Sequence, residues 1–171
     1  MHWTLVDPLK DVDDVIEIGQ RHLWAEDYTA LTTDPEVFRK CITMTATMQL
    51  FDKSKEFLAI CRNDKGEALG YCWFDRFGYT TYSTEEISNA KFHHVDLTLP
   101  VITRVKLINQ MIDQHILWAA KYNIPVICST SIRGEYDGFM KIHKKRGFTV
   151  NGSYAWGRTE KLLELLNDNL K

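Results

Sequence analysis

The sequence predicts an α/β fold, a central, twisted mixed β-sheet with helices on both faces. Helical and extended patterns alternate through the second half of the chain, which is typical of a sheet that contains parallel strands. A hairpin pattern near the middle of the chain turns at residues 63–66, where Gly66 tolerates a positive φ. The chain has 171 residues, of which 44% are hydrophobic, so we expect one domain over residues 1–171.

The first half of the chain predicts a strand, two helices and the hairpin. Asp11 is a suitable N-cap for the first helix. The second helix begins at Asp34-Pro35-Glu36, because these residues supply a cap, a proline for the first turn and an acid near the positive helix end. The expected elements are a strand at 3–6, a helix at 12–26, a helix that begins after Asp34, and strands at 56–62 and 68–75.

The second half predicts alternating strands and helices. Residues 78–89 are polar, and we expect them to form a loop or an irregular extension. Pro100 ends the strand that follows, and Val105, Ile108 and Ile112 begin the apolar stripe of a long helix. The remaining expected elements are strands at 92–99, 125–130, 148–150 and 153–159, and helices at 103–122, 138–146 and 161–170.

Composition argues against several classes of function. The formal net charge is −2, which gives no reason to expect a nucleic-acid partner. No apolar run is long enough to span a membrane, and the first residues lack a signal-peptide pattern, so we expect no membrane partner and a cytoplasmic location. The four cysteines match no zinc-binding spacing, and we expect no metal site.

The most distinctive segment is residues 139–148, Phe-Met-Lys-Ile-His-Lys-Lys-Arg-Gly-Phe. It predicts a short amphipathic helix that ends at Gly147 and leads through Phe148 into a strand. Together with the order of the other elements, this ending resembles the GNAT acetyltransferase superfamily over nearly the whole chain. The resemblance implies acetyl-CoA as cofactor, with the pantetheine arm along the strand before Pro100 and the pyrophosphate at the start of the long helix. The residues that it implies for cofactor binding are Val95, Leu97, Thr98, Arg104, Val105, Lys106 and Leu107.

The chain departs from the family at the pyrophosphate motif. The family pattern is arginine or glutamine, two residues, glycine, one residue, and glycine or alanine. The aligned run begins at Arg104 and contains no glycine, because Leu107 and Asn109 occupy the two small-residue positions. A leucine there is expected to crowd the pyrophosphate or shift its binding, since glycine permits close approach of phosphate to backbone. The run therefore leaves open whether the cofactor site is kept, altered or lost.

Three residues are candidates for proton transfer. The resemblance implies a proton donor four residues before Gly147, where the family often has tyrosine and this chain has His143. His94 and Asp96 share one face of the expected strand at 92–99, and either is a candidate general base. The alternatives are a structural histidine on the short helix and a half-buried strand with a polar face.

Two functions follow from these observations. The first is a GNAT-like N-acyltransferase that moves an acetyl group from acetyl-CoA to an amine on a small molecule or a protein. The second is a catalytically inactive GNAT-fold protein, for example a phage virion component, that acts through protein partners or as a homo-oligomer in a larger assembly. The glycine-free run favours the second function, and the order of the elements fits both.

Overall fold

The computed structural model describes residues 1–23, 34–131, 136–152 and 154–168. The chain divides into two compact units. The first comprises residues 1–73 and 92–108, and the second comprises residues 74–91 and 109–171. The single domain expected from the sequence stays a prediction. The strands form a mixed sheet in the order β1-β2-β3-β4-β5-β7-β6, which confirms the predicted α/β class and mixed sheet.

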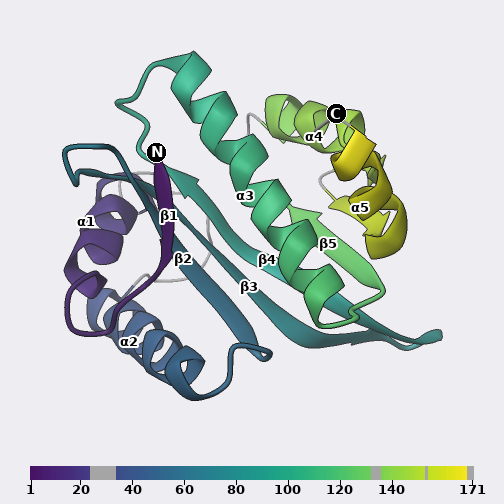
Figure 1. Ribbon diagram of the computed structural model, residues 1–171, viewed down its shortest axis with the longest axis horizontal. Coiled ribbons are helices and arrows are strands. Elements are labelled where there is room, and N and C mark those ends of the chain that lie inside the picture. Colours follow the sequence, from purple (N-terminus) through teal and green to yellow (C-terminus); the bar gives the residue numbers. More distant parts are fainter. Residues whose placement is uncertain (24–33, 132–135, 153, 169–171) are drawn as a thin grey trace. The chain divides into compact units, whose positions relative to one another are not determined.

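The first unit begins with a strand and two helices that pack side by side (Figure 1). The elements are β1 (His2–Leu5), α1 (Val12–Leu23), α2 (Pro35–Phe51) and β2 (Glu56–Arg62). Strand β1 pairs antiparallel with β2, with Trp3 opposite Cys61. Val15 and Ile16 of α1 and Ile42 of α2 lie in one apolar core, so each helix is held by the face that it buries.

Helix α2 starts as the sequence predicts. Asp34 is its N-cap and accepts hydrogen bonds from the backbone N–H groups of Glu36 and Val37, at 2.9 and 3.3 Å. Near its other end, the buried Gln49 side chain donates to the carbonyl oxygens of Val6 and Leu58, both at 3.1 Å. The amide of Gln49 thus fixes α2 to the chain beyond the end of β1.

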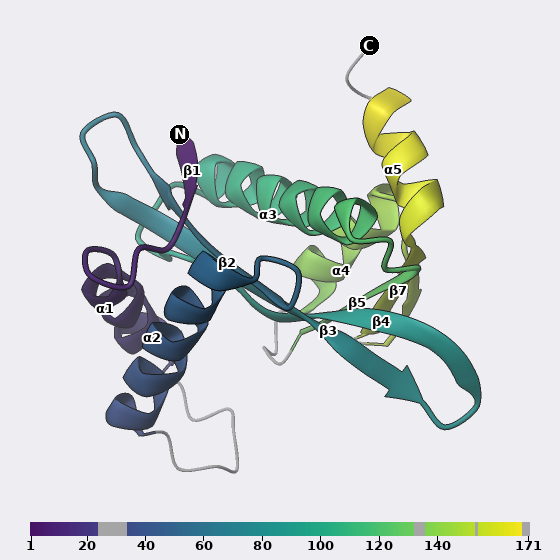
Figure 2. The same ribbon diagram turned by 60° about the horizontal axis from the view of Figure 1, so that its bottom comes forward.

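The predicted loop at residues 78–89 is wrong, because these residues belong to a long hairpin (Figure 2). Its strands are β3 (Ala68–Thr80) and β4 (Ser83–Val95). Arg76 Nε donates to Glu86 Oε1 at 2.6 Å across the hairpin, and a Cβ on Gly78 would lie 2.9 Å from the carbonyl oxygen of Ile87. The polar residues therefore pair between strands, a role that their polarity alone does not reveal.

The second unit holds the other strands and helices, and α3 begins in the first unit and ends in the second. The elements are α3 (Val101–Lys121), β5 (Val126–Thr130), α4 (Tyr136–Lys145), β6 (Thr149–Asn151), β7 (Tyr154–Arg158) and α5 (Thr159–Asp168). Strand β5 pairs parallel with β4 from Ile87↔Val126 to Asn89↔Cys128, and antiparallel with β7. Beyond Asn89, β4 continues for six residues past its last pairing with β5.

Gly147 ends α4 as predicted. Its φ is +90°, a conformation that glycine adopts without the steric cost of a side chain. A Cβ at this position would also lie 2.4 Å from Cδ1 of Leu165 on α5. None of the described helices is both long and apolar enough to cross a membrane.

Candidate functional site

The two predicted general bases lie in the first unit, His94 at the C-terminal end of β4 and Asp96 directly after it. The His94 ring is buried and stacks on Tyr71, with ring centroids 5.4 Å apart and planes 24° apart. Two residues earlier, Phe92 stacks on Trp73 at 6.0 Å. The face of β4 that bears His94 is therefore lined with aromatic rings of β3.

Asp96 closes a tight turn directly after β4, which ends at Val95 rather than at the predicted Leu99. Its Oδ1 accepts hydrogen bonds from the Thr98 backbone N–H at 2.9 Å and from Thr98 Oγ1 at 2.7 Å. Its own N–H donates to the Leu69 carbonyl of β3, also at 2.9 Å. The buried Asp96 carboxylate thus holds the chain in position between β4 and α3.

Helix α3 begins at Val101, two residues before the predicted start, and this corrects the position of the free N–H groups. The Arg104 N–H donates to the Pro100 carbonyl oxygen at 3.0 Å, so it lies inside the helical hydrogen-bond pattern. The backbone N–H groups of Arg104 to Leu107, residues that the resemblance implies for the pyrophosphate, therefore lie within α3. Proline has no N–H, so the groups left without a helical partner are those of residues 101–103.

Leu107 is fully buried, with 0% of its surface exposed. Its side chain therefore faces the core, and its predicted contact with a cofactor stays a prediction. The family's loop residues are helical in this chain, because α3 starts directly after Pro100. The side chain at position 107 joins the core.

The first turn of α3 has an unusual charge. It contains no acidic residue, whereas the other four described helices each have at least one. Those acids are Asp13 and Asp14 of α1, Glu36 of α2, Asp137 of α4 and Glu160 of α5. Acids usually stabilise the positive end of a helix. Here the nearest charged side chains along the helix are the cations Arg104 and Lys106, and Arg104 Nε is buried without a hydrogen-bond partner among the described residues.

These features fit the pyrophosphate of a CoA cofactor. The unused N–H groups of residues 101–103, the positive helix end and the cations of Arg104 and Lys106 are all suited to a phosphate group. Two features oppose it. Val101 and Ile102 expose apolar side chains in the same turn, and the Asp96 carboxylate precedes it. The donor groups outnumber the single carboxylate, whose Oδ1 already accepts two hydrogen bonds from Thr98.

His143, the predicted proton donor, lies on α4 in the second unit. It is only 1% exposed, and its ring packs against Phe139 and Phe148 with centroids 4.3 and 5.0 Å away. Nδ1 lies 3.0 Å from the Phe139 carbonyl oxygen, so this nitrogen carries a hydrogen and donates it. Burial lowers the pKa of His143 to about 4, and the ring is therefore neutral at pH 7.

A second buried histidine, His115 on α3, was missed by the sequence analysis. Its ring lies flat on Phe74, with centroids 3.9 Å apart and planes 7° apart, and Nε2 lies 2.6 Å from Ser88 Oγ. Burial, and to a smaller extent the charge of His143, lowers the pKa of His115 to about 3. The available signal was a histidine among the apolar positions of a long helix, four residues after Met111.

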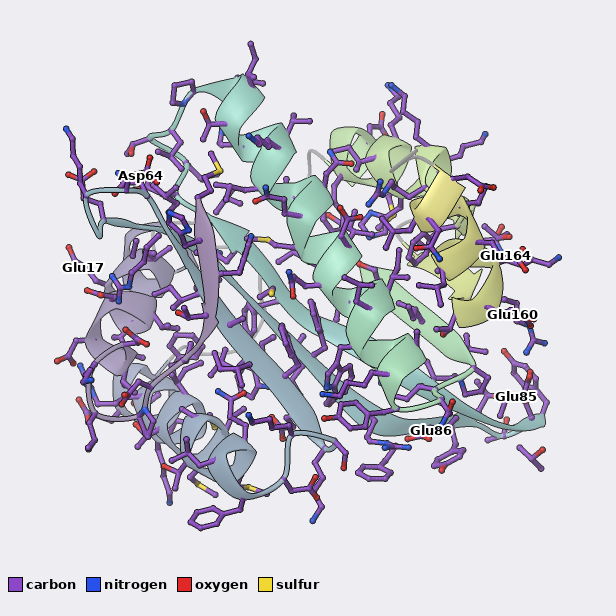
Figure 3. All side chains as sticks on the ribbon, viewed as in Figure 1. Glu17, Asp64, Glu85, Glu86, Glu160 and Glu164 are labelled. Carbon is purple, nitrogen blue, oxygen red and sulfur yellow. The ribbon has the colours of Figure 1, made fainter. Side chains whose placement is uncertain are left out.

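The acidic residues of the hairpin are engaged in ion pairs. Arg158 of β7 donates to Glu85, and Arg76 binds both carboxylate oxygens of Glu86 at 2.6 and 2.7 Å. The hydrogen bond from Arg76 lowers the pKa of Glu86. Figure 3 shows both carboxylates on β4, and Glu160 on α5 of the same unit. No group of three or more His, Cys, Asp or Glu side chains in the described residues could hold a metal ion.

Comparison with solved structures shows that the chain has the fold of GNAT acetyltransferases. No protein-family model matches the chain, and no curated protein matches it significantly. Solved structures do match. An N-acetyltransferase from Staphylococcus aureus Mu50 has a TM-score of 0.68 at 14% identity, over 92% of this chain and 98% of that one. A GNAT-family acetyltransferase from Streptococcus pneumoniae has a TM-score of 0.67 at 12% identity, with the same coverage. A Salmonella typhimurium protein described as an acetyltransferase, solved with its cofactor acetyl-CoA, has a TM-score of 0.67 at 12% identity, over 92% and 93%.

Proposed function

We propose that this chain, which has the fold of the GNAT acetyltransferases, is an N-acyltransferase that moves an acetyl group from acetyl-CoA to an amine. The observation that supports this most directly is the start of α3, where unused N–H groups lie beside two cations and no acid. A helix start with this composition suits an anion, and acetyl-CoA carries its pyrophosphate next to the pantetheine arm.

The first unit would bind the cofactor. Residues 101–103 would donate backbone N–H groups to the pyrophosphate, and Arg104 and Lys106 would supply positive charge. The strand end at Val95 and the turn at Leu97 and Thr98 would lie along the pantetheine arm. When bound, acetyl-CoA supplies a thioester that an amine can attack.

His94 would remove the proton from the incoming amine, and Asp96 would hold the turn beside it. His94 has an imidazole, the side-chain group that most often serves as a general base. The Asp96 carboxylate is held by Thr98 in the turn after β4. We therefore assign His94 the role of base and Asp96 the role of positioning the turn that carries the cofactor contacts.

His143 would supply the proton to the departing thiolate. Its Nδ1 hydrogen is already bound to the Phe139 carbonyl, so the exchangeable position is Nε2. Because its lowered pKa keeps the ring neutral, Nε2 would take up a proton from solvent and pass it to the thiolate, while the Nδ1 hydrogen stays bound to Phe139. A histidine in this state serves as a proton carrier, whereas the tyrosine usual in the family carries a proton at rest.

The experiment is a transfer assay read by mass spectrometry. Purified chain is incubated with acetyl-CoA and a panel of primary amines, polyamines and peptides with free N-termini, and a mass gain of one acetyl group is sought. Acetylated product that disappears in His94→Gln and His143→Gln supports the proposal. Absence of transfer to every acceptor, with the chain folded and acetyl-CoA bound, contradicts the catalytic part alone.

A second candidate function rests on the apolar side chains of Val101 and Ile102, which are exposed by 62% and 84% at the start of α3. With the Asp96 carboxylate before them, they favour a protein contact at this point over a phosphate. The chain would then be a catalytically inactive GNAT-fold protein in an assembly. Failure of acetyl-CoA to bind, together with copurification of a partner that Ile102→Lys releases, would favour this function.

A further inference from the structure

Helix α2 exposes an apolar stripe along its full length. We call this set the α2 stripe, and it comprises Val37, Cys41, Met44, Met48 and Phe51. Four of the five have exposures between 44% and 87%, and the cysteine is exposed as well. The buried face of the same helix carries Ile42 and Ala46, both with no exposed surface. The helix is therefore apolar on two faces and covered on one.

The spacing of the α2 stripe indicates the shape of what covers it. Its members follow one another at intervals of four, three, four and three residues, a repeat of 3.5. This repeat keeps a seam of side chains facing a second helix, as in coiled coils. A helix that is apolar on both faces is normally buried on both. The geometry thus favours a helix as the partner of the α2 stripe.

We propose that the partner is a second copy of this chain, with the two α2 helices packed antiparallel through the α2 stripe. This arrangement places Met44 against Met48 of the second copy, and Cys41 against Phe51 of the second copy. The proposal does not depend on the proposed enzymatic activity, because it uses no residue assigned to cofactor binding or proton transfer.

Charges at the two ends of α2 favour this orientation. In the antiparallel pair, Lys40 lies at the level of Asp52, the C-cap of α2 in the second copy. A parallel pair would instead place Lys40 beside Lys40 and Glu36 beside Glu36. Antiparallel helices also bring opposite ends of their dipoles together.

The length of α2 also suits a dimer. A helix of 17 residues is about 25 Å long. Two such helices that pack along their length approach the roughly 1,000 Å² that a specific interface buries in total. Thr43 Oγ1 and Thr47 Oγ1 beside the stripe donate to carbonyl oxygens one turn earlier, at 2.9 and 2.8 Å, so these hydroxyls need no partner across the interface.

The first test is the mass of the full chain in solution, measured by sedimentation over a wide range of concentrations. We expect a dimer that dissociates on dilution. Met44→Glu and Met48→Lys should each weaken dimerisation about tenfold or more, because each buries a charge. Mixing the two variants should restore the dimer, since the antiparallel pair sets position 44 against position 48. The matched control is Leu50→Glu, an exposed residue of α2 that lies outside the stripe.

The second test is disulfide crosslinking. In a Cys41→Ser background, a chain with Met44→Cys mixed with a chain with Met48→Cys should crosslink to each other, and the first alone should not. Ready oxidation of wild-type chains through Cys41, the one exposed cysteine of the four, would indicate a parallel pair and overturn the proposed orientation. A chain that is monomeric at every concentration, or a dimer that Met44→Glu leaves intact, would overturn the proposal.

Discussion

His115 Nε2 lies 2.6 Å from Ser88 Oγ, and this pair joins the middle of α3 to β4 inside the second unit. Ser88 Oγ also donates its hydrogen to the Asp75 carbonyl oxygen at 2.8 Å. A serine hydroxyl has one hydrogen to give, so His115 must be the donor in its bond to Ser88. The tautomer with hydrogen on Nε2 follows from these two distances.

Ser88→Ala is expected to lower the free energy of unfolding by about 1–3 kcal/mol. The substitution leaves both the His115 N–H and the Asp75 carbonyl oxygen without their partner in a buried place. Denaturant titration measures the loss. The control is Thr84→Ala on the exposed part of the same strand, which should change stability by less than about 1 kcal/mol. Equal effects of the two substitutions would contradict the account of the His115 pair.

Acid should destabilise the chain well above the pH at which carboxylates titrate. His115 and His143 have pKa values of about 3 and about 4 when folded, compared with an unfolded value of 6.5. Between these values the unfolded chain binds more protons than the folded chain, so lowering the pH favours unfolding. At pH 5 each histidine should have lost about 2 kcal/mol of stability relative to pH 8.

Denaturant titrations at pH 8 and pH 5 check this prediction. His143→Gln and His115→Gln should each remove about half of the difference, because glutamine keeps polarity without titrating. Stability that stays constant between the two pH values would mean that the two rings are not buried in the neutral form.

Two glycines of the C-terminal region should respond in opposite directions to alanine. Gly147→Ala is expected to destabilise by about 1–3 kcal/mol, because its φ of +90° and the nearby Leu165 both disfavour a side chain. Gly138→Ala should stabilise by up to about 1 kcal/mol, since Gly138 lies within α4 and a Cβ there meets no atom within 4 Å. Thermal unfolding of the two variants gives the comparison, and a loss at position 138 would contradict it.

His143→Gln tests the proton carrier. If the chain transfers acetyl groups, this variant should lower kcat about a hundredfold and leave the affinity for acetyl-CoA unchanged. Phe139 and Phe148 hold the ring on two sides, so glutamine keeps much of the packing that alanine would lose. A change in affinity with an unchanged kcat would assign His143 to the structure of α4.

The elements with strong local signals could be predicted from the sequence. Asp34 caps α2, β2 covers residues 56–62, and Gly147 ends α4, because a cap, an apolar run and a glycine at positive φ act locally. The hairpin strands at residues 78–89 could not be predicted in this way. Their polar side chains bind groups on β3: Glu86 binds Arg76, and Ser88 binds the carbonyl oxygen of Asp75. Pairing between distant residues leaves little trace in composition.

The candidate site was predicted only in part, for a related reason. The pattern that begins at Arg104 was aligned with a loop, yet Pro100 starts the helix earlier and moves the unused N–H groups to residues 101–103. His115 lies among the apolar positions of α3, and its neutral state depends on burial that only the fold provides.

The central claim is that the start of α3 binds the pyrophosphate of acetyl-CoA, and titration calorimetry with acetyl-CoA tests it most directly. The account predicts saturable binding by the wild-type chain and at least tenfold weaker binding by Arg104→Ala. Lys141→Ala, which removes an exposed cation of α4, should bind as the wild-type chain does. No binding of acetyl-CoA to the folded wild-type chain, or equal binding by Arg104→Ala, would contradict the account.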